Sequence, residues 1–393
     1  MSDLAALTAA TANLPAPLVA LDLPAARANA GDLVRRAAGT PVRVASKSVR
    51  CRYVLDLALG TPGFAGVMAY SVREAIWLAG TARGGAPGTV GEAGGVLLGY
   101  PSADKAAIAE LGADPALVEA ITLMVDGAEQ LELIRAATEV PLRVCLDIDA
   151  SLRIGRLHLG ARRSPLRTPA DAAGLAAVAA GLGLRVVGVM FYEAQIAGLP
   201  DSSPAVRMVK ARSATELSRR RGTVVAAVQD AIGGTLQLVN SGGTGSLEIS
   251  SADPCVTEVT AGSGLYTPAL FDHYRAFEPR PALYFALPVV RRPAPGIATL
   301  FGGGYIASGP SGRSRLPSLA TSGLKLIGTE GAGEVQTPVR GRAAAGLRVG
   351  DRVWFRHAKA GELLERFDTV HVVDGGRLVE SVPTYRGEGR TFG

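Results

Sequence analysis

Cysteine is scarce in this chain of 393 residues. Its three cysteines, Cys51, Cys145 and Cys255, lie far apart and form no CxxC pair. This spacing argues against both a disulfide framework and a structural zinc site, and it is typical of a reducing compartment. We therefore expect a cytoplasmic protein.

Long hydrophobic runs, clusters of basic residues and aromatic residues are also lacking. No apolar stretch approaches the roughly 20 residues that a membrane-spanning helix needs. Lys and Arg exceed Asp and Glu by 41 to 35 without a run of five or more, and aromatic residues make up 5%. Neither nucleic acid nor a membrane is therefore an expected partner. The surplus positive charge favours small anionic molecules instead.

Lysine is rare among the basic residues, most of which are arginines. A remaining lysine is informative because, of the two side chains, lysine can lose its proton and attack a carbonyl carbon. The five lysines are Lys47, Lys105, Lys210, Lys325 and Lys359.

Short apolar, β-rich runs alternate with segments of helical periodicity along the first two thirds of the chain. The eight expected strands cover residues 41–46, 63–69, 94–100, 121–126, 142–149, 184–192, 235–242 and 258–263. The helical segments are residues 24–38, 71–84, 103–112, 127–138, 169–182 and 207–232. This alternation predicts parallel strands in an α/β fold, and eight units indicate a closed (β/α)₈ barrel over residues 24–275. An open doubly wound sheet is disfavoured because no glycine follows the first strand.

The pattern changes after Gly264 to short strands and Gly-rich turns without long helices. We expect residues 1–23 and 276–393 to form a smaller β-rich domain, to which residues 17–23 contribute a strand. Residues 291–296, RRPAPG, are interpreted as a linker or an edge turn. Asp374-Gly375-Gly376 predicts a hairpin near the C-terminus.

Reactive residues of a barrel lie at the C-terminal ends of its strands. The first strand ends in Ser46-Lys47-Ser48, and period-two alternation allows Lys47 to point into the barrel mouth. Such a lysine could form a Schiff base with a carbonyl group. From position alone, a solvated lysine at a strand end is the commoner interpretation.

The seventh and eighth expected strands end in glycine-rich turns. Residues 240–246, NSGGTGS, and residues 261–264, AGSG, offer backbone N–H groups beside hydroxyls. Either turn alone could be an ordinary loop, but together they favour a phosphorylated ligand.

Polar residues also close the fifth and sixth strands. Arg153 and Tyr192 could contact a heteroaromatic ring, and we expect Asp147 and Asp149 to be ion-pair partners of Arg153. In the C-terminal region, His357 and Lys359 follow an apolar run two residues apart. Alternation would place both side chains on one face, where they could reach one point.

These stretches together resemble the fold-type III pyridoxal-phosphate enzymes. The resemblance is to the alanine racemase N-terminal domain and, more specifically, to the D-threonine aldolase and D-serine dehydratase-like group, and it covers about residues 15 to 385. The stretches that carry it are RVASKSVR, FYEAQIAG, NSGGTGS, TEVTAGSGLY and GDRVWFRHAK.

The resemblance implies a role for each candidate residue. Lys47 would hold pyridoxal 5′-phosphate as a Schiff base, Arg153 and Tyr192 would lie along its ring, and Gln195 would lie near the ring edge. The phosphate would be held by Ser241, Gly242, Gly243, Thr244, Gly262 and Ser263. The resemblance further implies a homodimer in which the C-terminal β domain completes the active site.

One position departs from the pattern of that group. Its members usually carry His-x-Asp or His-x-Cys, two ligands of a divalent metal, where this chain has His357 and Lys359. A protonated lysine cannot coordinate a metal, so His357 remains as a possible single ligand and Lys359 argues against the site. We hypothesise that the Lys359 ammonium replaces the metal beside His357.

The resulting functional hypothesis is a lyase that acts on a D-configured, β-hydroxylated amino acid, with Lys47, His357 and Lys359 as catalytic residues. The reaction would be retro-aldol cleavage or dehydration with loss of ammonia. A racemase is the alternative, for which Tyr266 or Tyr305 could supply the second base. A non-catalytic protein that binds the cofactor is a further alternative. The sequence assigns no role to the C-terminal residues 384–393.

Overall fold

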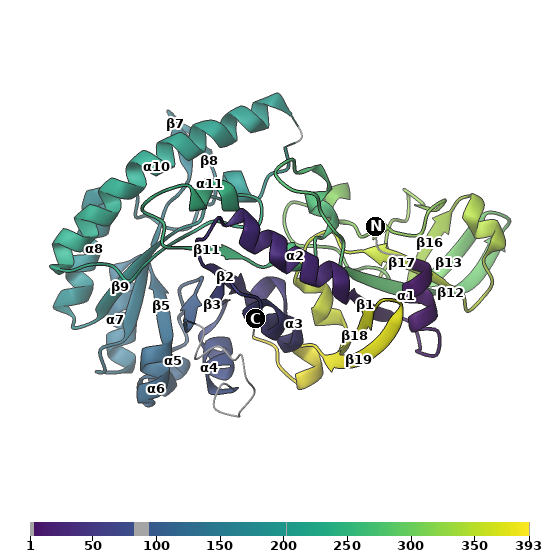
Figure 1. Ribbon diagram of the computed structural model, residues 1–393, viewed down its shortest axis with the longest axis horizontal. Helices are drawn as coiled ribbons and strands as arrows, with labels where there is room; N and C mark the ends of the chain where they lie inside the picture. The colour runs from purple at the N-terminus through teal and green to yellow at the C-terminus, as the bar shows by residue number, and fades with distance from the viewer. Residues whose placement is uncertain (1–3, 82–93, 202, 393) are drawn as a thin grey trace. The chain divides into compact units, whose positions relative to one another are not determined.

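The computed structural model describes residues 4–81, 94–201 and 203–392, which form two compact units (Figure 1). The barrel unit comprises residues 31–47, 55–262 and 392–393. The sheet unit comprises residues 1–30, 48–54 and 263–391. Lys47 lies in the barrel unit, whereas His357 and Lys359 lie in the sheet unit.

Eight parallel strands close the barrel, which confirms the predicted (β/α)₈ fold. Pairing of the last strand with the first, for example Val259 with Val42, completes the ring. The strands are β2 (Val42–Ala45), β3 (Phe64–Ala69), β4 (Val96–Leu98), β5 (Ile121–Val125), β6 (Arg143–Ile148), β9 (Arg185–Phe191), β10 (Leu238–Ser241) and β11 (Glu258–Ala261).

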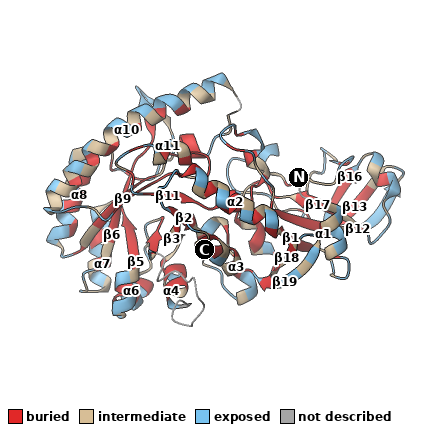
Figure 2. Ribbon diagram, in the orientation of Figure 1, coloured by how far each residue is buried: buried red, intermediate tan, exposed pale blue. Residues whose placement is uncertain are grey.

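The barrel strands are mostly apolar because both of their faces are covered. All five residues of β5 are buried, and Figure 2 shows the neighbouring β6 as mostly buried. A buried ion pair between Arg43 of β2 and Glu258 of β11, with atoms 2.7 Å apart, joins the first strand to the last. The barrel interior is thus packed, and its ligand site must lie at the strand ends.

Helices lie at the six expected positions, although residues 82–84 of one expected helix lie outside the described residues. They are α2 (Leu23–Arg36), α4 (Val72–Thr81), α5 (Lys105–Gly112), α7 (Ala128–Ala137), α8 (Pro169–Gly181) and α10 (Pro204–Ile232). The shorter helices α3 (Arg52–Leu59), α6 (Pro115–Ala120), α9 (Ala194–Ala197) and α11 (Leu247–Ser251) were not predicted from the sequence. Within the described ranges, none of the helices combines the length and the apolar composition that crossing a membrane would need.

Local sequence signals fix the ends of the two longest barrel helices. Thr168 and Asp171 form a capping box at the start of α8, and Ser203 caps α10. Gly233 ends α10 in the left-handed conformation that glycine tolerates best. Helices α8 and α10 pack side by side (Figure 1).

The sheet unit is built on a mostly antiparallel sheet of nine strands. They are β1 (Leu18–Asp22), β12 (Leu283–Ala294), β13 (Ile297–Phe301), β14 (Ser318–Leu319), β15 (Lys325–Leu326), β16 (Gln336–Arg340), β17 (Arg352–Arg356), β18 (Thr369–Asp374) and β19 (Arg377–Pro383). Strand β1 pairs with β12 and β18, as expected for an N-terminal strand that joins this domain.

Two local predictions in this unit have different outcomes. The hairpin is confirmed, because Asp374 pairs with Arg377 across the turn between β18 and β19. The linker interpretation of residues 291–296 is wrong, because β12 continues to Ala294 and turns directly into β13. Arginines and proline are accommodated there because the end of the strand is exposed rather than buried.

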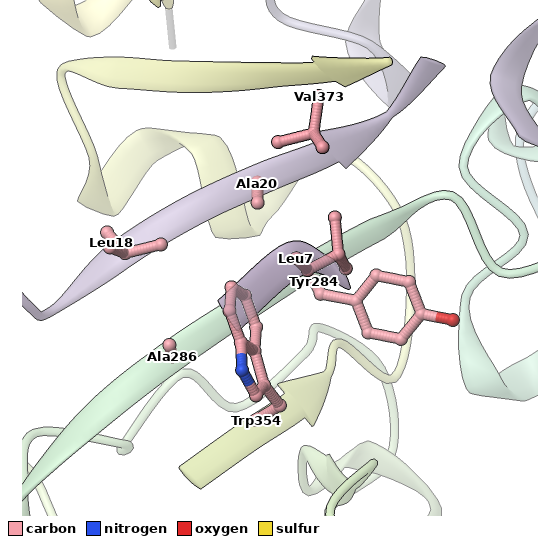
Figure 3. Packing of buried hydrophobic residues seen from close by; sticks show 7 residues of the cluster. All are labelled: Leu7, Leu18, Ala20, Tyr284, Ala286, Trp354 and Val373. Atoms are coloured by element: carbon pink, nitrogen blue, oxygen red, sulfur yellow. The ribbon is translucent and has the colours of Figure 1, made fainter. Parts of the chain in front are cut away.

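A compact apolar cluster holds the N-terminal segment on the sheet (Figure 3). The ring of Trp354 packs on this segment, and its indole N–H donates to the Thr8 hydroxyl of α1 (Leu4–Ala10) over 2.8 Å. The members of the cluster are Leu7, Leu18, Ala20, Tyr284, Ala286, Trp354 and Val373. Strand β17, which leads to His357, is therefore anchored in a rigid core.

Candidate functional site

Lys47 lies at the C-terminal end of the first barrel strand. It follows β2 in a short 3₁₀ turn, which Ser46 fixes by donating its hydroxyl to the Met68 carbonyl over 3.0 Å. The exposed Lys47 side chain donates from Nζ to the Tyr100 hydroxyl over 2.7 Å. Nζ also lies 5.3 Å from the centroid of the Tyr100 ring. With Nζ only 2.7 Å from the hydroxyl oxygen, this distance places the nitrogen beyond the hydroxyl group and not over the ring face. The contact is therefore a hydrogen bond.

Tyr100 was not selected from the sequence. It follows β4 by two residues, so it also lies at the C-terminal end of a barrel strand. The signal that could have found it is the polar tip of an aromatic residue that ends an apolar run. Tyr100 and Lys47 connect the third and first barrel strands at the mouth.

Arg163 is the second residue that sequence reasoning missed. Its guanidinium carbon lies 5.4 Å from the ring centroid of Tyr100 and 5.3 Å from that of Tyr192. The neighbouring Ser164 fixes this segment by donating to the Asp147 carbonyl over 2.6 Å. Two aromatic rings thus hold an arginine in place beside the partner of Lys47.

Tyr192 follows β9 and contacts both Arg163 and the glycine-rich turn after β10. Burial raises the pKa of its phenol, while the charge of Arg163 lowers it. A Cβ atom placed on Gly243 would lie 3.6 Å from Cε2 of Tyr192. The ring therefore borders the turn that the sequence assigns to phosphate.

Gln195 is buried in α9, the short helix that follows β9. Its Nε2 donates to the Ala150 carbonyl over 2.7 Å. Its Oε1 has no hydrogen-bond partner in residues 4–81, 94–201 and 203–392. This unpaired acceptor could receive a hydrogen bond from a ligand.

Arg153 pairs with one of its two expected acidic partners. It lies in a hairpin of β7 (Leu152–Ile154) and β8 (Leu157–Leu159), and its Nη2 is 2.6 Å from Oδ2 of Asp149. Its side chain is 43% exposed. Its ion pair with Asp149 confirms one of the two expected partners, whereas Arg163 is the arginine that contacts Tyr192.

Asp147 is not the ion-pair partner of Arg153 that the sequence suggested. Its side chain is buried, and no residue in the described ranges donates a hydrogen bond to its carboxyl group. Burial raises the pKa of this carboxyl to about 7, and the nearby Asp126 adds to the rise while Arg163 opposes it. A carboxyl group at the barrel mouth is therefore partly protonated near neutral pH.

The turn after β10 is organised by a buried carboxylate, that of Glu193. This carboxylate accepts from the Ser241 hydroxyl at 3.0 Å and from the Gly242 N–H at 3.2 Å. It also accepts from the hydroxyls of Ser246, at 2.8 Å, and Ser250. The donors of Ser241 and Gly242 thus face the protein.

The remainder of this turn suits the close approach of an anion. Gly242 has φ of 93°, and a Cβ atom on Gly243 would lie 2.8 Å from Cβ of Ala197. Both positions require glycine. Thr244 and Gly245 are buried, and the Gly245 N–H has no partner among the described residues. Such an N–H group fits a phosphate oxygen.

The turn after β11 contains the last two predicted phosphate residues. Gly262 is buried and ends a segment of the barrel unit. Ser263 opens a 3₁₀ turn, in which its carbonyl accepts from the Thr267 N–H over 3.0 Å.

His357 is buried directly after β17. Neither of its ring nitrogens has a hydrogen-bond partner in the part of the chain that the structure describes. Burial lowers its pKa to about 3, and the charge of Arg356 adds to this effect. The Leu283 carbonyl raises the pKa of His357, although it does not form a hydrogen bond of normal geometry with the ring. The imidazole is therefore neutral near pH 7.

Lys359 is half-buried, and its Nζ donates to the Ser308 hydroxyl over 3.1 Å. Within the described ranges, no three or more His, Cys, Asp or Glu side chains are grouped so that they could hold a metal ion. The residue two positions after His357 is thus an ammonium donor, which cannot coordinate a metal ion.

The two tyrosines considered as a second base differ in environment. The Tyr266 hydroxyl donates to the Val49 carbonyl over 2.9 Å, and complete burial raises its pKa far above the ordinary value. Tyr305 packs against Phe285 and Phe367 at centroid distances of 5.2 and 5.4 Å. Burial also raises its pKa. Neither phenol is prepared to accept a proton near neutral pH.

No protein-family model and no curated protein matches the sequence, but solved structures do. D-threonine aldolase from Filomicrobium marinum has 20% identity and a TM-score of 0.76, with 96% of both chains covered. D-threo-3-hydroxyaspartate dehydratase from Delftia sp. HT23 has 18% identity and a TM-score of 0.71, with 95% of this chain and 98% of that chain covered. Alanine racemase from Corynebacterium glutamicum has 16% identity and a TM-score of 0.59, with 86% and 88% covered.

These similarities extend over both units, since they cover nearly the whole chain. They confirm the resemblance predicted from the sequence at the level of the fold, a (β/α)₈ barrel with an additional sheet unit.

Proposed function

We propose that the chain is a pyridoxal-phosphate-dependent lyase that acts on a D-configured, β-hydroxylated amino acid. The observation that carries the proposal is the position of Lys47. Its amine lies at the mouth of the barrel, at the end of the first strand, in hydrogen-bond contact with Tyr100. The fold is that of a D-threonine aldolase and a D-threo-3-hydroxyaspartate dehydratase.

The residues at the barrel mouth fit this cofactor. Lys47 would bind its aldehyde carbon, Tyr192 would lie along its ring, and Gln195 would lie near the ring edge. Thr244, Gly262 and Ser263, together with the buried N–H of Gly245, would hold the phosphate. Ser241, Gly242 and Gly243 would shape that turn, because the carboxylate of Glu193 already accepts from the first two. Once bound, the cofactor withdraws electrons from the bond that breaks at Cα.

Two proton transfers distinguish the two possible lyase reactions. A neutral His357 can accept the proton of the β-hydroxyl group, which favours cleavage between Cα and Cβ. A neutral Lys47 amine can accept the proton from Cα, which favours loss of the β-hydroxyl group and then of ammonia. The proposal includes both reactions, and product analysis separates them.

Lys359 would take the place of the metal ion at this position. Its ammonium group would donate a hydrogen bond to a substrate hydroxyl or carboxylate oxygen beside His357. We further propose that the protein is a cytoplasmic homodimer in which the sheet unit completes the active site. Sedimentation of the purified chain tests the dimer.

The absorbance of the purified protein tests the proposal. We expect a visible band with cofactor that Lys47→Ala abolishes and that Lys105→Ala, a change of an exposed lysine on α5, retains. Absence of the band from the wild-type protein with added cofactor would refute cofactor binding.

Assays with D-threonine and D-serine then identify the reaction. Release of an aldehyde would indicate aldol cleavage, and release of ammonia with a 2-oxo acid would indicate dehydration. Interconversion of enantiomers without either product would replace the lyase by a racemase. A band without any turnover would instead support a non-catalytic cofactor-binding protein.

A further inference from the structure

Arg163 presents an unpaired guanidinium group at the barrel mouth. The side chain is exposed, and it forms no hydrogen bond or ion pair with any residue that the structure describes. Arginine has five N–H donors in a planar fork that matches the two oxygens of a carboxylate. In most proteins such a group is solvated and mobile, so its fixed position needs a reason.

Two tyrosine rings fix the group without using its donors. Stacking on the ring faces of Tyr100 and Tyr192, at 5.4 and 5.3 Å, restricts the guanidinium while its N–H groups remain available. The following residue anchors the backbone, because the Ser164 hydroxyl donates to the Asp147 carbonyl and accepts from the Leu166 N–H. Arg163 is thus preorganised, which lowers the entropy cost of binding a ligand.

The neighbours of Arg163 place it at the reacting end of the site. Tyr100, which it contacts, accepts the hydrogen bond of the Lys47 amine. The glycine-rich turn that suits a phosphate borders Tyr192, the other ring that Arg163 contacts, through Gly243. A cofactor attached to Lys47 would have its phosphate in that turn. Through Tyr100, Arg163 would then lie next to the amine that the substrate amino group replaces.

The charge of Arg163 is incompletely balanced at neutral pH. Asp147 is an acidic group within electrostatic reach of Arg163, and its carboxyl group is partly protonated near pH 7. Tyr192 is a neutral phenol because burial raises its pKa. An anion would relieve this excess of positive charge.

We infer that Arg163 is the receptor for the α-carboxylate of the amino-acid substrate and so determines specificity for amino acids over simple amines. This inference rests on the proposed function, since it assumes that the substrate amine approaches Lys47. Arg153 is the less suitable arginine, because Asp149 already occupies its guanidinium group.

The experiment compares two ligands that differ in the carboxylate. The cofactor-loaded protein is titrated with D-alanine and with ethylamine, and the dissociation constants are read from the change of the visible absorbance band. We expect Arg163→Gln to weaken binding of D-alanine about ten- to hundredfold, the range for a lost charge-assisted pair, and to change ethylamine binding less than twofold. Arg163→Lys should fall between, because lysine keeps the charge and lacks the fork.

Arg162→Gln is the matched control. Arg162 is the adjacent residue, it is also exposed, and it has no contact with either tyrosine ring among the described residues. Binding of both ligands to this variant should remain within twofold of the wild type.

Each other result would overturn the inference. Equal weakening of D-alanine and ethylamine would indicate a structural role, and weaker binding of the cofactor itself would identify the phosphate as the anion that Arg163 holds. An unchanged dissociation constant for D-alanine would show that another residue binds the carboxylate. If the wild-type protein gave no absorbance band, the proposed function would fail first and the inference with it.

Discussion

The Lys47 amine and the Tyr100 hydroxyl lie 2.7 Å apart at the ends of the first and third strands of the barrel. This contact fixes the position of the one lysine that the sequence singled out for carbonyl chemistry. It also gives Tyr100 a place next to the atom that would react. The hydroxyl can therefore orient the amine or exchange a proton with it.

Replacing Tyr100 by phenylalanine removes the hydroxyl and keeps the ring on which Arg163 stacks. We expect the cofactor band to persist and kcat to fall about ten- to hundredfold, as for a lost hydrogen bond to a charged group. Steady-state kinetics and the pH profile of kcat provide the measurement. Tyr53→Phe is a control, because Tyr53 is none of the residues that we assign to the proposed site. An unchanged kcat in Tyr100→Phe would contradict a role of the hydroxyl.

Glu193 is the residue on which the phosphate turn depends. Replacing it by glutamine exchanges one acceptor oxygen for an NH₂ group. That group would face either the donors of Ser241 and Gly242 at Oε2 or the hydroxyls of Ser246 and Ser250 at Oε1. We expect a loss of about 1–3 kcal/mol in the free energy of unfolding, together with weaker cofactor binding. Urea denaturation and cofactor titration provide the two measurements.

The control for Glu193 is Glu132→Gln, which changes an exposed glutamate in the middle of α7. Its unfolding free energy should change by no more than about 0.5 kcal/mol. If Glu193→Gln bound the cofactor as tightly as the wild type, the carboxylate would not be needed to shape the turn.

The sequence was sufficient for the architecture of the chain because its eight apolar runs have the length and spacing of buried parallel strands. The strand ends then located Lys47, Tyr192 and the glycine-rich turns without any knowledge of contacts. Gly242 and Gly243 illustrate the reason. Glycine is the residue type that adopts a positive φ and leaves space for a close neighbour, so its presence in the sequence already indicates such a turn.

Contacts between distant segments could not be predicted in the same way. Arg163 lies between β8 and α8, in a stretch whose backbone no hydrophobic period determines. Asp147 and Asp149 are two residues apart, yet β6 ends at Ile148 and their surroundings differ: Asp149 meets Arg153, whereas Asp147 stays buried without such a partner. The alternation of side-chain directions predicts orientation within a strand, and it no longer does so for residues beyond the strand end.

Asp147 should make the stability of the barrel depend on pH. Its native pKa of about 7 exceeds the ordinary value of 3.8, so the native state binds more protons than the unfolded chain between these two values. Stability therefore falls as pH rises from about 4 to about 7, and the loss persists above pH 7. The corresponding free energy is on the order of 4 kcal/mol.

Asp147→Asn should remove this loss, because asparagine has no charge to bury. We expect its melting temperature to exceed that of the wild type at pH 8 and to approach it near pH 4, where Asp147 is protonated in the native state and partly protonated in the unfolded chain. Calorimetry over this range provides the measurement, and the comparison at pH 4 is the internal control. A constant difference between the two proteins at all pH values would show that Asp147 does not titrate as described.

The presence of Lys359 next to His357 leads us to expect that activity does not depend on a divalent metal. Its ammonium, held by Ser308, repels a cation, although the adjacent His357 keeps both ring nitrogens without partners among the described residues. We expect the purified protein to contain no stoichiometric zinc or manganese and to retain its turnover in the presence of a chelator. Lys359→Asp should instead bind zinc and change its turnover on addition of metal, because a carboxylate next to His357 supplies a second ligand. Lys325→Asp, a change of an exposed lysine in the same unit, should do neither. Stoichiometric metal in the wild-type protein that is lost in His357→Ala would show that Lys359 does not replace it.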